Sequence, residues 1–371
     1  MKKRYGSLID GSWVKHKKTF DVINPFDNSK ILEVYDAEES GTLEAIKSSA
    51  NAFKKWKKIS AEERSNYLKK FHLLVLKNKK NIAKIITREC GKPLRESLVE
   101  VEYGASFIEW SANQCLRNCG KIFESSDKTK KMFYIKEPVG VVAAITPWNF
   151  PLAMVTRKVS AALAAGCCVV LKPSELTPIT ALVLGELSVE AKFPKGIFNI
   201  VNGKPKVIGD ILSKNPTVKK ITFTGSTKVG KLLMKNSSKT IKNISLELGG
   251  NAPFIVFSDA NIDLAIEGLI NAKFRNAGQT CISANRIFLN KEIHEDFLIK
   301  LKNRLKKMRI GSGLNDCDIG PLISKQALEK VENHIQDALN KGAKIEFGGK
   351  LHKPNSLLFE PTILTSIKQN M

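Results

Sequence analysis

The 371-residue chain contains no apolar stretch that approaches the roughly 18–20 residues of a membrane-spanning helix. It also has no internal repeat and no low-complexity linker. A composition of 43% hydrophobic and 26% charged residues excludes a disordered tail, a collagen and a disulfide-stapled mini-protein. Residues Met1–Arg4 are basic, but Asp10 comes before an apolar segment can build, which argues against a signal peptide. We therefore expect a cytoplasmic protein with no membrane partner and two or three domains.

Acidic residues are scarce relative to basic ones, since 36 Asp and Glu against 60 Lys and Arg give a formal charge of +24. Such a balance suggests a nucleic-acid partner. However, only 10 of the 60 are Arg, the side chain suited to bidentate contacts with bases and phosphates. The lysines are also spread along the chain, as at Lys128–Lys131 and Lys302–Lys307. We expect solvated surface lysines and no nucleic acid, with a polyanion-binding protein as the alternative.

The seven cysteines form no C-x-x-C pair. Cys115 and Cys119 could share a helix face, but no His or second Cys pair completes a zinc set, so we expect no metal site. Cys167 and Cys168 lie in an apolar run that is typical of a core. The odd count favours free thiols, one of which could be a nucleophile.

Apolar strand candidates alternate with helix-like segments from residue 139 onward. The expected strands are Val139–Ile145, Val169–Leu171, Ile197–Val201, Lys220–Phe223 and Ile244–Glu247, and the expected helices are Leu152–Ala165, Ile179–Ala191, Lys206–Leu212 and Lys228–Lys235. This alternation predicts a doubly wound α/β domain with a parallel sheet, whose ligands bind beyond the carboxyl ends of the strands.

A second α/β unit is expected to begin near Leu248. It would contain a strand at Phe254–Phe257, a helix at Ile262–Phe274 and a strand at Arg286–Leu289. Before residue 100, a strand-rich arm precedes helices, one of which starts at a capping box formed by Ser60 and Glu63. Gly91 is expected to end a helix, and residues 118–136 read as a hairpin.

Polar or glycine-containing segments follow the expected strands. They are Thr146–Pro151, Lys172–Glu175, Phe223–Gly230, and the pair Leu246–Asn251 and Gly278–Cys281. Gly225 permits a tight turn before a helix whose free N–H groups could bind a phosphate. Cys281 is a loop thiol that could ionise, and the Asn149 amide could donate to an oxyanion. Each of these features alone has a more common explanation. Gly225 would then mark a tight turn, Cys281 would be an inert thiol, Asn149 would be a turn residue and Glu247 would be a solvated carboxylate.

Together these segments resemble the aldehyde dehydrogenase superfamily, from about Leu8 to Thr365. The resemblance is carried, in the family's order, by Glu137–Gly140, Pro147–Pro151, Leu246–Gly250 and Gly278–Cys281. Met154–Lys158, Ser245–Phe257 and Lys273–Ala277 are most similar to the succinate-semialdehyde dehydrogenases. The resemblance implies an aldehyde dehydrogenase-like α/β fold with a Rossmann-type NAD(P)-binding domain at 1–117 and 137–247. It further implies an oligomerisation hairpin at 118–136, a catalytic domain at 248–371 and a homo-oligomer, a dimer or a tetramer.

The resemblance also assigns roles. Cys281 attacks the aldehyde as a thiolate, Asn149 and the Cys281 backbone N–H hold the oxyanion, and Glu247 is the general base that hydrolyses the thioester. The implied cofactor-binding residues are Thr146, Pro147, Trp148, Lys172, Ser174, Glu175, Gly225, Ser226 and Leu248. Glu175 repels a 2′-phosphate whereas Lys172 attracts it, so we expect NAD with NADP tolerated. Arg157 and Arg275 match arginines that bind the substrate carboxylate, and the alternative for each is a helix-surface arginine in a structural ion pair.

Two departures from the family pattern bear on activity. Ser283 stands where some relatives carry a second Cys, so we expect no local disulfide switch. The family continues beyond the position of Met371, through a Glu-x-Phe-Gly-Pro-type segment whose Glu holds the nicotinamide ribose. Our expectation is NAD(P)-dependent oxidation of an aldehyde, succinate semialdehyde foremost, through a thioester on Cys281. The alternative is a truncated, inactive remnant or a non-catalytic nucleotide-binding scaffold.

Overall fold

The computed structural model describes residues 4–371, which pack into two compact units. Unit 1 comprises the residues up to Val22, Leu32–Ile82 and Val99–Glu247, and unit 2 comprises Ile23–Ile31, Ala83–Leu98 and Leu248–Met371. The assignment of residues 1–117 and 137–247 to cofactor binding, and of 248–371 to catalysis, stays a prediction. By packing, residues 23–31 and 83–98 belong with unit 2.

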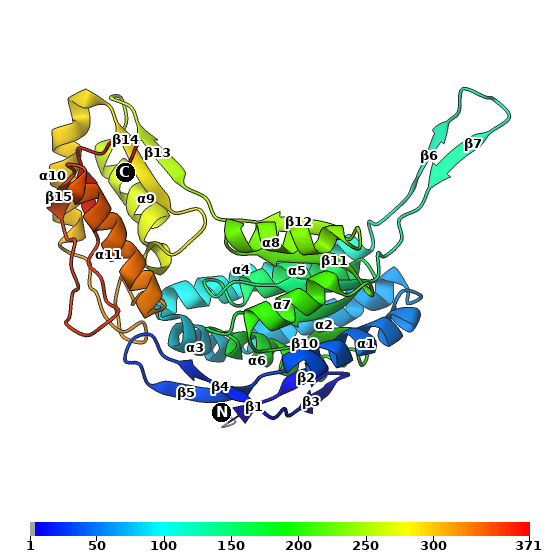
Figure 1. Ribbon diagram of the computed structural model, residues 1–371. Coiled ribbons are helices and arrows are strands. Elements are labelled where there is room, and N and C mark those ends of the chain that lie inside the picture. Colours follow the sequence, from blue (N-terminus) through cyan, green and yellow to red (C-terminus); the bar gives the residue numbers. More distant parts are fainter. Residues whose placement is uncertain (1–3) are drawn as a thin grey trace. The chain divides into compact units, whose positions relative to one another are not determined.

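Unit 1 is built on a seven-stranded sheet with the order β12-β11-β8-β9-β10-β2-β3 (Figure 1). Its strands are β2 (Ser7–Ile9), β3 (Ser12–Val14), β8 (Val141–Ile145), β9 (Cys168–Lys172), β10 (Phe198–Ile200), β11 (Val218–Thr224) and β12 (Asn243–Glu247). Strands β8 to β12 pair in parallel, as predicted, and β2 and β3 add an antiparallel edge. Because the strand order reverses at β8, the β8–β11 boundary is the switch point where open α/β sheets bind ligands.

Helices cover both faces of this sheet. On one side lie α1 (Glu38–Trp56), α7 (Pro205–Lys214) and α8 (Thr227–Ser238), and on the other α2 (Ala61–Lys77), α5 (Ala153–Ala164) and α6 (Ile179–Glu190). α1 contacts β8, β9 and β10, and α5 contacts β8 and β9. The strand residues Cys168–Leu171 are therefore fully buried, as expected for a sheet that is covered on both faces. Cys167 and Cys168 are core residues, as predicted.

The N-terminal part contains a three-stranded sheet of β1 (Arg4–Tyr5), β5 (Lys30–Tyr35) and β4 (Thr19–Ile23), followed by helices. The predicted capping box is present, because Ser60 Oγ accepts from Glu63 N and Glu63 Oε2 accepts from Ser60 N, both at 3.1 Å. Helix α3 (Lys79–Cys90) ends directly before Gly91, as predicted. Helix α4 (Leu94–Cys115) ends at Cys115, so the helix face proposed for Cys115 and Cys119 is wrong.

Unit 2 packs helices against a two-stranded parallel sheet. Its elements are β13 (Ala252–Val256), α9 (Ile262–Phe274), η1 (Arg275–Gly278), β14 (Ala284–Leu289), η2 (Lys291–Ile293), α10 (His294–Leu305), α11 (Lys325–Asn340), β15 (Lys344–Phe347) and β16 (Ile363–Thr365). Helix α9 has the bounds that the sequence predicts. Side chains of α9 and α10, including Leu269 and Phe297, form a hydrophobic core in unit 2. In contrast, Ile255, Phe257 and Phe288 on and beside the strands stay exposed.

Residues 118–136 contain the expected hairpin, with β6 (Lys121–Glu124) paired antiparallel to β7 (Lys131–Tyr134). Figure 1 shows it as a long arm that extends away from the sheet of unit 1. Its apolar side chains are exposed, Ile122 at 83%. Across the part of the chain that the structure describes, no helix is long and apolar enough to span a bilayer. Within the same residues, no group of three or more His, Cys, Asp or Glu could hold a metal ion.

Candidate active site

The predicted cofactor segments and Glu247 lie at the carboxyl-terminal edge of the sheet in unit 1, where its parallel strands end. Thr146 follows β8, Lys172 ends β9, Gly225 follows β11 and Glu247 ends β12. Backbone hydrogen bonds join neighbouring strand ends. Thr146 N donates to Lys172 O at 3.1 Å, and Gly225 N donates to Glu247 O at 3.0 Å. The parallel sheet thus brings together residues that are up to about a hundred positions apart in the chain.

The turn from β11 into α8 has the geometry of an anion site. A Cβ added at Gly225 would lie 2.4 Å from the Phe223 ring, so this tight turn requires glycine. Ser226 is the N-cap of α8, and its Oγ accepts from Val229 N at 3.4 Å. The first N–H groups of α8 have no partner within the helix and favour a negative charge. The predicted role of Ser226 toward a pyrophosphate therefore fits this turn.

Lys172 and Glu175 form an ion pair at the end of β9. The ammonium of Lys172 is buried and donates to Glu175 Oε2 at 2.8 Å. Burial lowers the pKa of Lys172 below its ordinary value, and the adjacent Glu175 carboxylate opposes that effect. Ser174 has its hydroxyl turned to the backbone, where it accepts from Leu176 N at 3.2 Å. The pair thus presents one carboxylate and one ammonium to anything bound at this edge.

The sheet edge also carries polar groups that lack partners. Thr146 is 4% exposed, and within the described residues neither its Oγ1 nor that of buried Thr224 has a hydrogen-bond partner. A buried hydroxyl without a partner costs about 1–3 kcal/mol, so a bound ligand that supplies one is favoured here. With the α8 N-terminus and Lys172–Glu175, these residues fit a nicotinamide dinucleotide. Pro147, Trp148 and Asn149, which follow Thr146, are partly buried.

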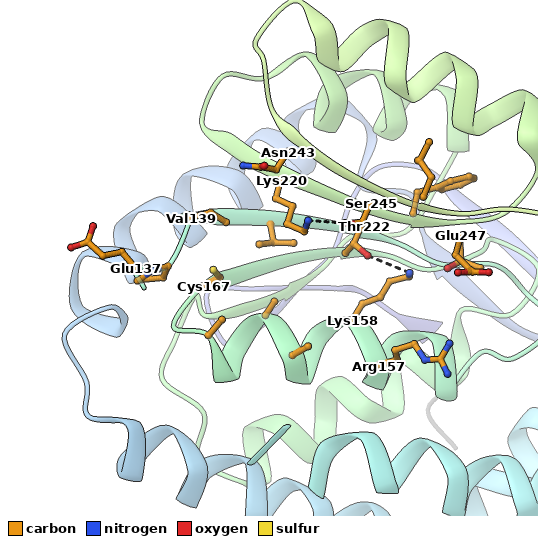
Figure 2. Close-up of a pocket in the computed structure, with 18 residues that line it drawn as sticks. Glu137, Val139, Arg157, Lys158, Cys167, Lys220, Thr222, Asn243, Ser245 and Glu247 are labelled. Carbon is orange, nitrogen blue, oxygen red and sulfur yellow. Dashed lines mark hydrogen bonds between the residues drawn. The ribbon is translucent and has the colours of Figure 1, made fainter. Parts of the chain in front are cut away.

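A cavity of about 520 Å³ opens between α5 and the strands β8, β11 and β12 (Figure 2). Its lining includes Arg157, Lys158, Thr222, Phe223 and Glu247. The structure therefore places the predicted general base, Glu247, and the predicted substrate residue Arg157 in one cavity.

Arg157 is held in position by two aromatic side chains of α4. Its guanidinium lies 4.4 Å from the ring centroid of Phe107, and its Nη2 donates to the hydroxyl of Tyr103 at 2.7 Å. A cation over an aromatic face gains about 0.5–2 kcal/mol, which restricts the arginine to this orientation. The guanidinium stays exposed, so its remaining donors can reach a carboxylate.

The start of α5 is fixed by a residue of the same neighbouring helix. Glu100 is buried, and its Oε1 accepts from the backbone N–H groups of Leu152 at 2.9 Å and of Ala153 at 3.2 Å. α5 has no side-chain cap of its own. A carboxylate at a helix N-terminus satisfies free N–H groups and interacts favourably with the helix dipole. Glu100 thereby anchors the helix that carries Arg157.

Lys158 is a site residue that the sequence reasoning missed. It is 9% exposed, and its ammonium donates to Thr222 Oγ1 at 3.3 Å (Figure 2). Burial and the adjacent Arg157 lower the pKa of Lys158 to about 8, while Glu247 acts in the opposite direction. This lysine therefore changes its charge near neutral pH, close to the predicted base. The signal available in the sequence was a lysine within an otherwise apolar helix face.

The other predicted residues lie in unit 2, where Arg275 and Cys281 are exposed in the loop between α9 and β14. Within this loop, Asn276 (φ 52°, ψ 40°) and Ala277 (φ 55°, ψ 34°) are both left-handed. That conformation costs about 1–2 kcal/mol for each residue with a Cβ. The loop therefore needs tertiary contacts to keep its shape. Leu248, the first residue of the last segment of unit 2, is partly buried, and its role stays a prediction.

Gly250 approaches Cys281 closely, and hydrogen bonds hold the residues that follow Cys281 in the chain. A Cβ added at Gly250 would lie 2.9 Å from the carbonyl oxygen of Cys281, so only glycine allows this approach. Ser283 is buried, and its hydroxyl donates to Lys273 O at 3.2 Å. The ammonium of Lys273 donates to Asn285 Oδ1 at 2.6 Å, and burial lowers the pKa of this lysine. Ser283 stands where some relatives carry a second Cys, and its hydroxyl joins the end of this loop to Lys273.

The sequence matches the aldehyde dehydrogenase family over residues 13–371. It is 45% identical to a succinate-semialdehyde dehydrogenase (NADP+) of Escherichia coli K12 over 370 residues, which are 99% of this chain and 77% of that protein. A glutarate-semialdehyde dehydrogenase of Pseudomonas aeruginosa is also 45% identical, with the same coverage.

A solved structure shows the same fold. It is a betaine aldehyde dehydrogenase of Staphylococcus aureus in complex with NAD+, 34% identical, with a TM-score of 0.96 over 99% of this chain and 76% of that one. The predicted fold class is confirmed. The chain therefore belongs to the aldehyde dehydrogenase family of NAD(P)-dependent oxidoreductases.

Proposed function

We propose that this enzyme oxidises an aldehyde that carries a carboxylate at its far end, succinate semialdehyde foremost. The observation that carries the proposal is the Arg157 guanidinium, which Tyr103 and Phe107 hold at the wall of the cavity that contains Glu247. A fixed guanidinium is the donor geometry that a carboxylate prefers. The names of the two semialdehyde dehydrogenases among the relatives describe such substrates.

In the proposed reaction, the Cys281 thiolate forms a C–S bond with the aldehyde carbon. The carbonyl oxygen becomes an oxyanion that accepts from the Asn149 amide and the Cys281 backbone N–H. As the oxyanion collapses to a thioester on Cys281, the aldehyde carbon would lose its hydrogen as hydride, and the nicotinamide of a bound cofactor would supply the acceptor. Glu247 then takes a proton from a water molecule that attacks the thioester, the C–S bond breaks, and Cys281 leaves as a thiolate. Lys158, with its pKa of about 8, can exchange a proton beside Glu247.

The alternative of a truncated, inactive remnant is not favoured. Similarity to the two semialdehyde dehydrogenases extends over 99% of the chain, and the chain contains the proposed Cys281, Glu247 and Asn149. Both units also have buried hydrophobic cores.

The substrate proposal is tested by comparing succinate semialdehyde with butanal, an uncharged aldehyde with the same number of carbons. We expect Arg157→Ala and Arg275→Ala each to raise KM for succinate semialdehyde at least tenfold, because a charge-assisted hydrogen bond contributes about 1.5–3 kcal/mol. KM for butanal should change less than threefold. Arg304→Ala, which removes a surface pair with Glu267, is the control. Equal effects on both aldehydes would contradict carboxylate binding.

We further propose that NAD is the preferred cofactor and that NADP is tolerated, because the Glu175 carboxylate repels a 2′-phosphate while its partner Lys172 attracts it. Glu175→Gln keeps the size of the side chain and removes its charge. The ratio of kcat/KM for NADP to that for NAD should then rise about tenfold, which corresponds to about 1.4 kcal/mol. Glu190→Gln, at the exposed end of α6, is the matched control. An unchanged ratio in Glu175→Gln would argue against this role.

We also propose that the chain forms a homo-oligomer, a dimer or a tetramer. The support is the hairpin of β6 and β7, whose apolar side chains Ile122, Phe133 and Ile135 are exposed on an arm away from the sheet. Exposed groups of apolar side chains of this kind mark surfaces that bind other protein chains. Sedimentation equilibrium measures the assembly state directly.

A further inference from the structure

The first turn of α4 is a platform that hydrogen bonds anchor to other segments of unit 2. Leu94 N donates to Gly313 O at 2.8 Å, and the buried hydroxyls of Ser97 and Thr87 are 2.8 Å apart. Glu96 lies between these two anchors. A side chain of this turn therefore has a well-defined position relative to the rest of unit 2.

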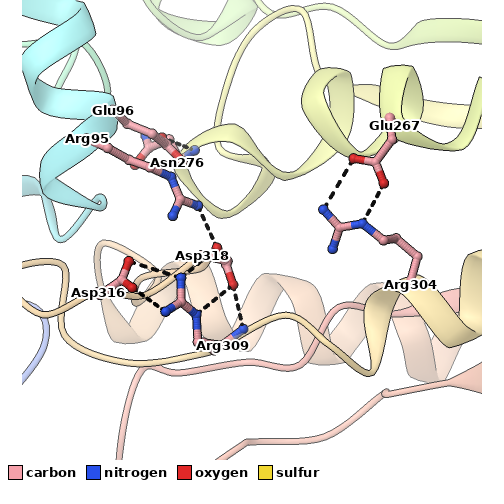
Figure 3. Close-up of polar contacts among 8 residues, drawn as sticks. All are labelled: Arg95, Glu96, Glu267, Asn276, Arg304, Arg309, Asp316 and Asp318. Atoms are coloured by element: carbon pink, nitrogen blue, oxygen red, sulfur yellow. Dashed lines mark hydrogen bonds and ion pairs between the residues drawn. The ribbon is translucent and has the colours of Figure 1, made fainter. Parts of the chain in front are cut away.

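From this platform Glu96 reaches the loop that leads to Cys281. Its Oε2 accepts from the backbone N–H of Asn276 at 2.7 Å (Figure 3). Asn276 is 1% exposed and is the first of the two left-handed residues of the loop. A left-handed residue points its N–H away from the helical direction of α9, so this N–H needs an acceptor from another element.

The conformation at Asn276 is passed on toward Cys281 by Gln279. Gln279 Nε2 donates to Asn276 O at 3.0 Å, and Gln279 Oε1 accepts from Ile323 N at 3.0 Å. Cys281 follows two residues later and is exposed. The direction in which the chain enters Cys281 thus depends on a series of partly buried hydrogen bonds that starts at Glu96.

We propose that Glu96 is a positioning residue for the nucleophile: its carboxylate holds Asn276 in the left-handed conformation and so sets the orientation of Cys281. The inference rests on Cys281 being the nucleophile of the proposed reaction. The preceding residue, Arg95, forms an ion pair with Asp318 at 2.9 Å, which further ties this turn to unit 2. Burial raises the pKa of Glu96, while the Asn276 N–H, Lys92, Arg95 and Arg275 oppose that effect.

The proposal is tested with three substitutions that separate hydrogen bonding from charge and reach. Glu96→Gln keeps the length and one oxygen acceptor, Glu96→Asp shortens the reach by one methylene, and Glu96→Ala removes the acceptor. Glu267→Ala, which removes another carboxylate of unit 2 that pairs with Arg304, is the control (Figure 3). The first readout is amide hydrogen exchange of the whole chain, followed by mass spectrometry of peptides that span residues 275–283.

We expect exchange in 275–283 to become at least tenfold faster in Glu96→Ala and Glu96→Asp and to stay within threefold of the parent in Glu96→Gln and Glu267→Ala. Peptides from the α9 core around Leu269 should keep their slow exchange, which shows that the effect is local. With aldehyde and NAD(P), kcat should fall at least tenfold in the same two variants, with KM for the cofactor unchanged.

Two results would overturn the proposal. One is unchanged exchange in residues 275–283 of Glu96→Ala, and the other is faster exchange there without any fall in kcat relative to the parent. If the parent chain itself does not oxidise the aldehyde, the proposed function fails, whereas the exchange readout still decides whether Glu96 holds the loop.

Discussion

Replacing Cys281 with serine should lower kcat for aldehyde oxidation by about four orders of magnitude or more and leave cofactor binding intact. A thiol ionises near pH 8.5, whereas a hydroxyl does not ionise at neutral pH and is a far weaker nucleophile. Loss of a nucleophile leaves only the rate that binding and oxyanion stabilisation supply. Formation of NAD(P)H measures the rate, and quenching of protein fluorescence measures cofactor binding.

The chain offers a matched control for this substitution. Cys119 and Cys281 are the two exposed cysteines among the described residues, and the other five are buried. Cys119→Ser should therefore keep full activity. In that background, iodoacetamide should inactivate the enzyme in step with alkylation of Cys281, as followed by mass spectrometry. More than 1% residual activity in Cys281→Ser, or inactivation without modification of Cys281, would show that another group is the nucleophile.

Glu247→Gln should stop the enzyme at the thioester. The substitution keeps the shape of the side chain at the end of β12 but removes the base that activates water, a contribution of about 10²–10⁴-fold. We expect one rapid equivalent of NAD(P)H per active site, followed by a steady-state rate that is lower by two to three orders of magnitude. Mass spectrometry should then find an acyl group on the peptide that contains Cys281.

Two further measurements define what this result means. Hydroxylamine is a strong nucleophile that needs no base, so it should restore turnover of Glu247→Gln by cleaving the thioester. Glu267→Gln, on the surface of unit 2, should behave as the parent chain does. If Glu247→Gln forms no rapid equivalent of NAD(P)H, Glu247 acts instead before the thioester forms.

The alternation of apolar strands and helices was readable from the sequence because a parallel sheet covered on both faces requires continuous apolar strands. The predicted strands at Val169–Leu171 and Ile244–Glu247 are present, each extended by one or two residues, and Ile262–Phe274 is a helix with the predicted bounds. The antiparallel edge formed by β2 and β3 was not predicted. Strands of three residues carry too little periodicity to be recognised.

The candidate site was predicted in part. Residues at strand ends, such as Thr146 and Lys172, could be proposed from the sequence because ligands of open α/β sheets bind at the carboxyl ends of strands. Lys158 was missed because its importance comes from burial, which lowers its pKa, and burial depends on what packs around a helix. Glu96 was missed because its partner Asn276 is 180 residues away in the sequence.

By itself, the sequence determined the α/β class and the family, and it predicted Cys281, Glu247 and Asn149 as catalytic residues, because these depend on local patterns and on motifs with chemistry of their own. Only the tertiary structure decided which charges are buried, which hydroxyls lack partners and how the Cys281 loop is held. Those properties arise from contacts between segments distant in the chain, and in such contacts desolvation and hydrogen-bond geometry, rather than residue type, set the energies.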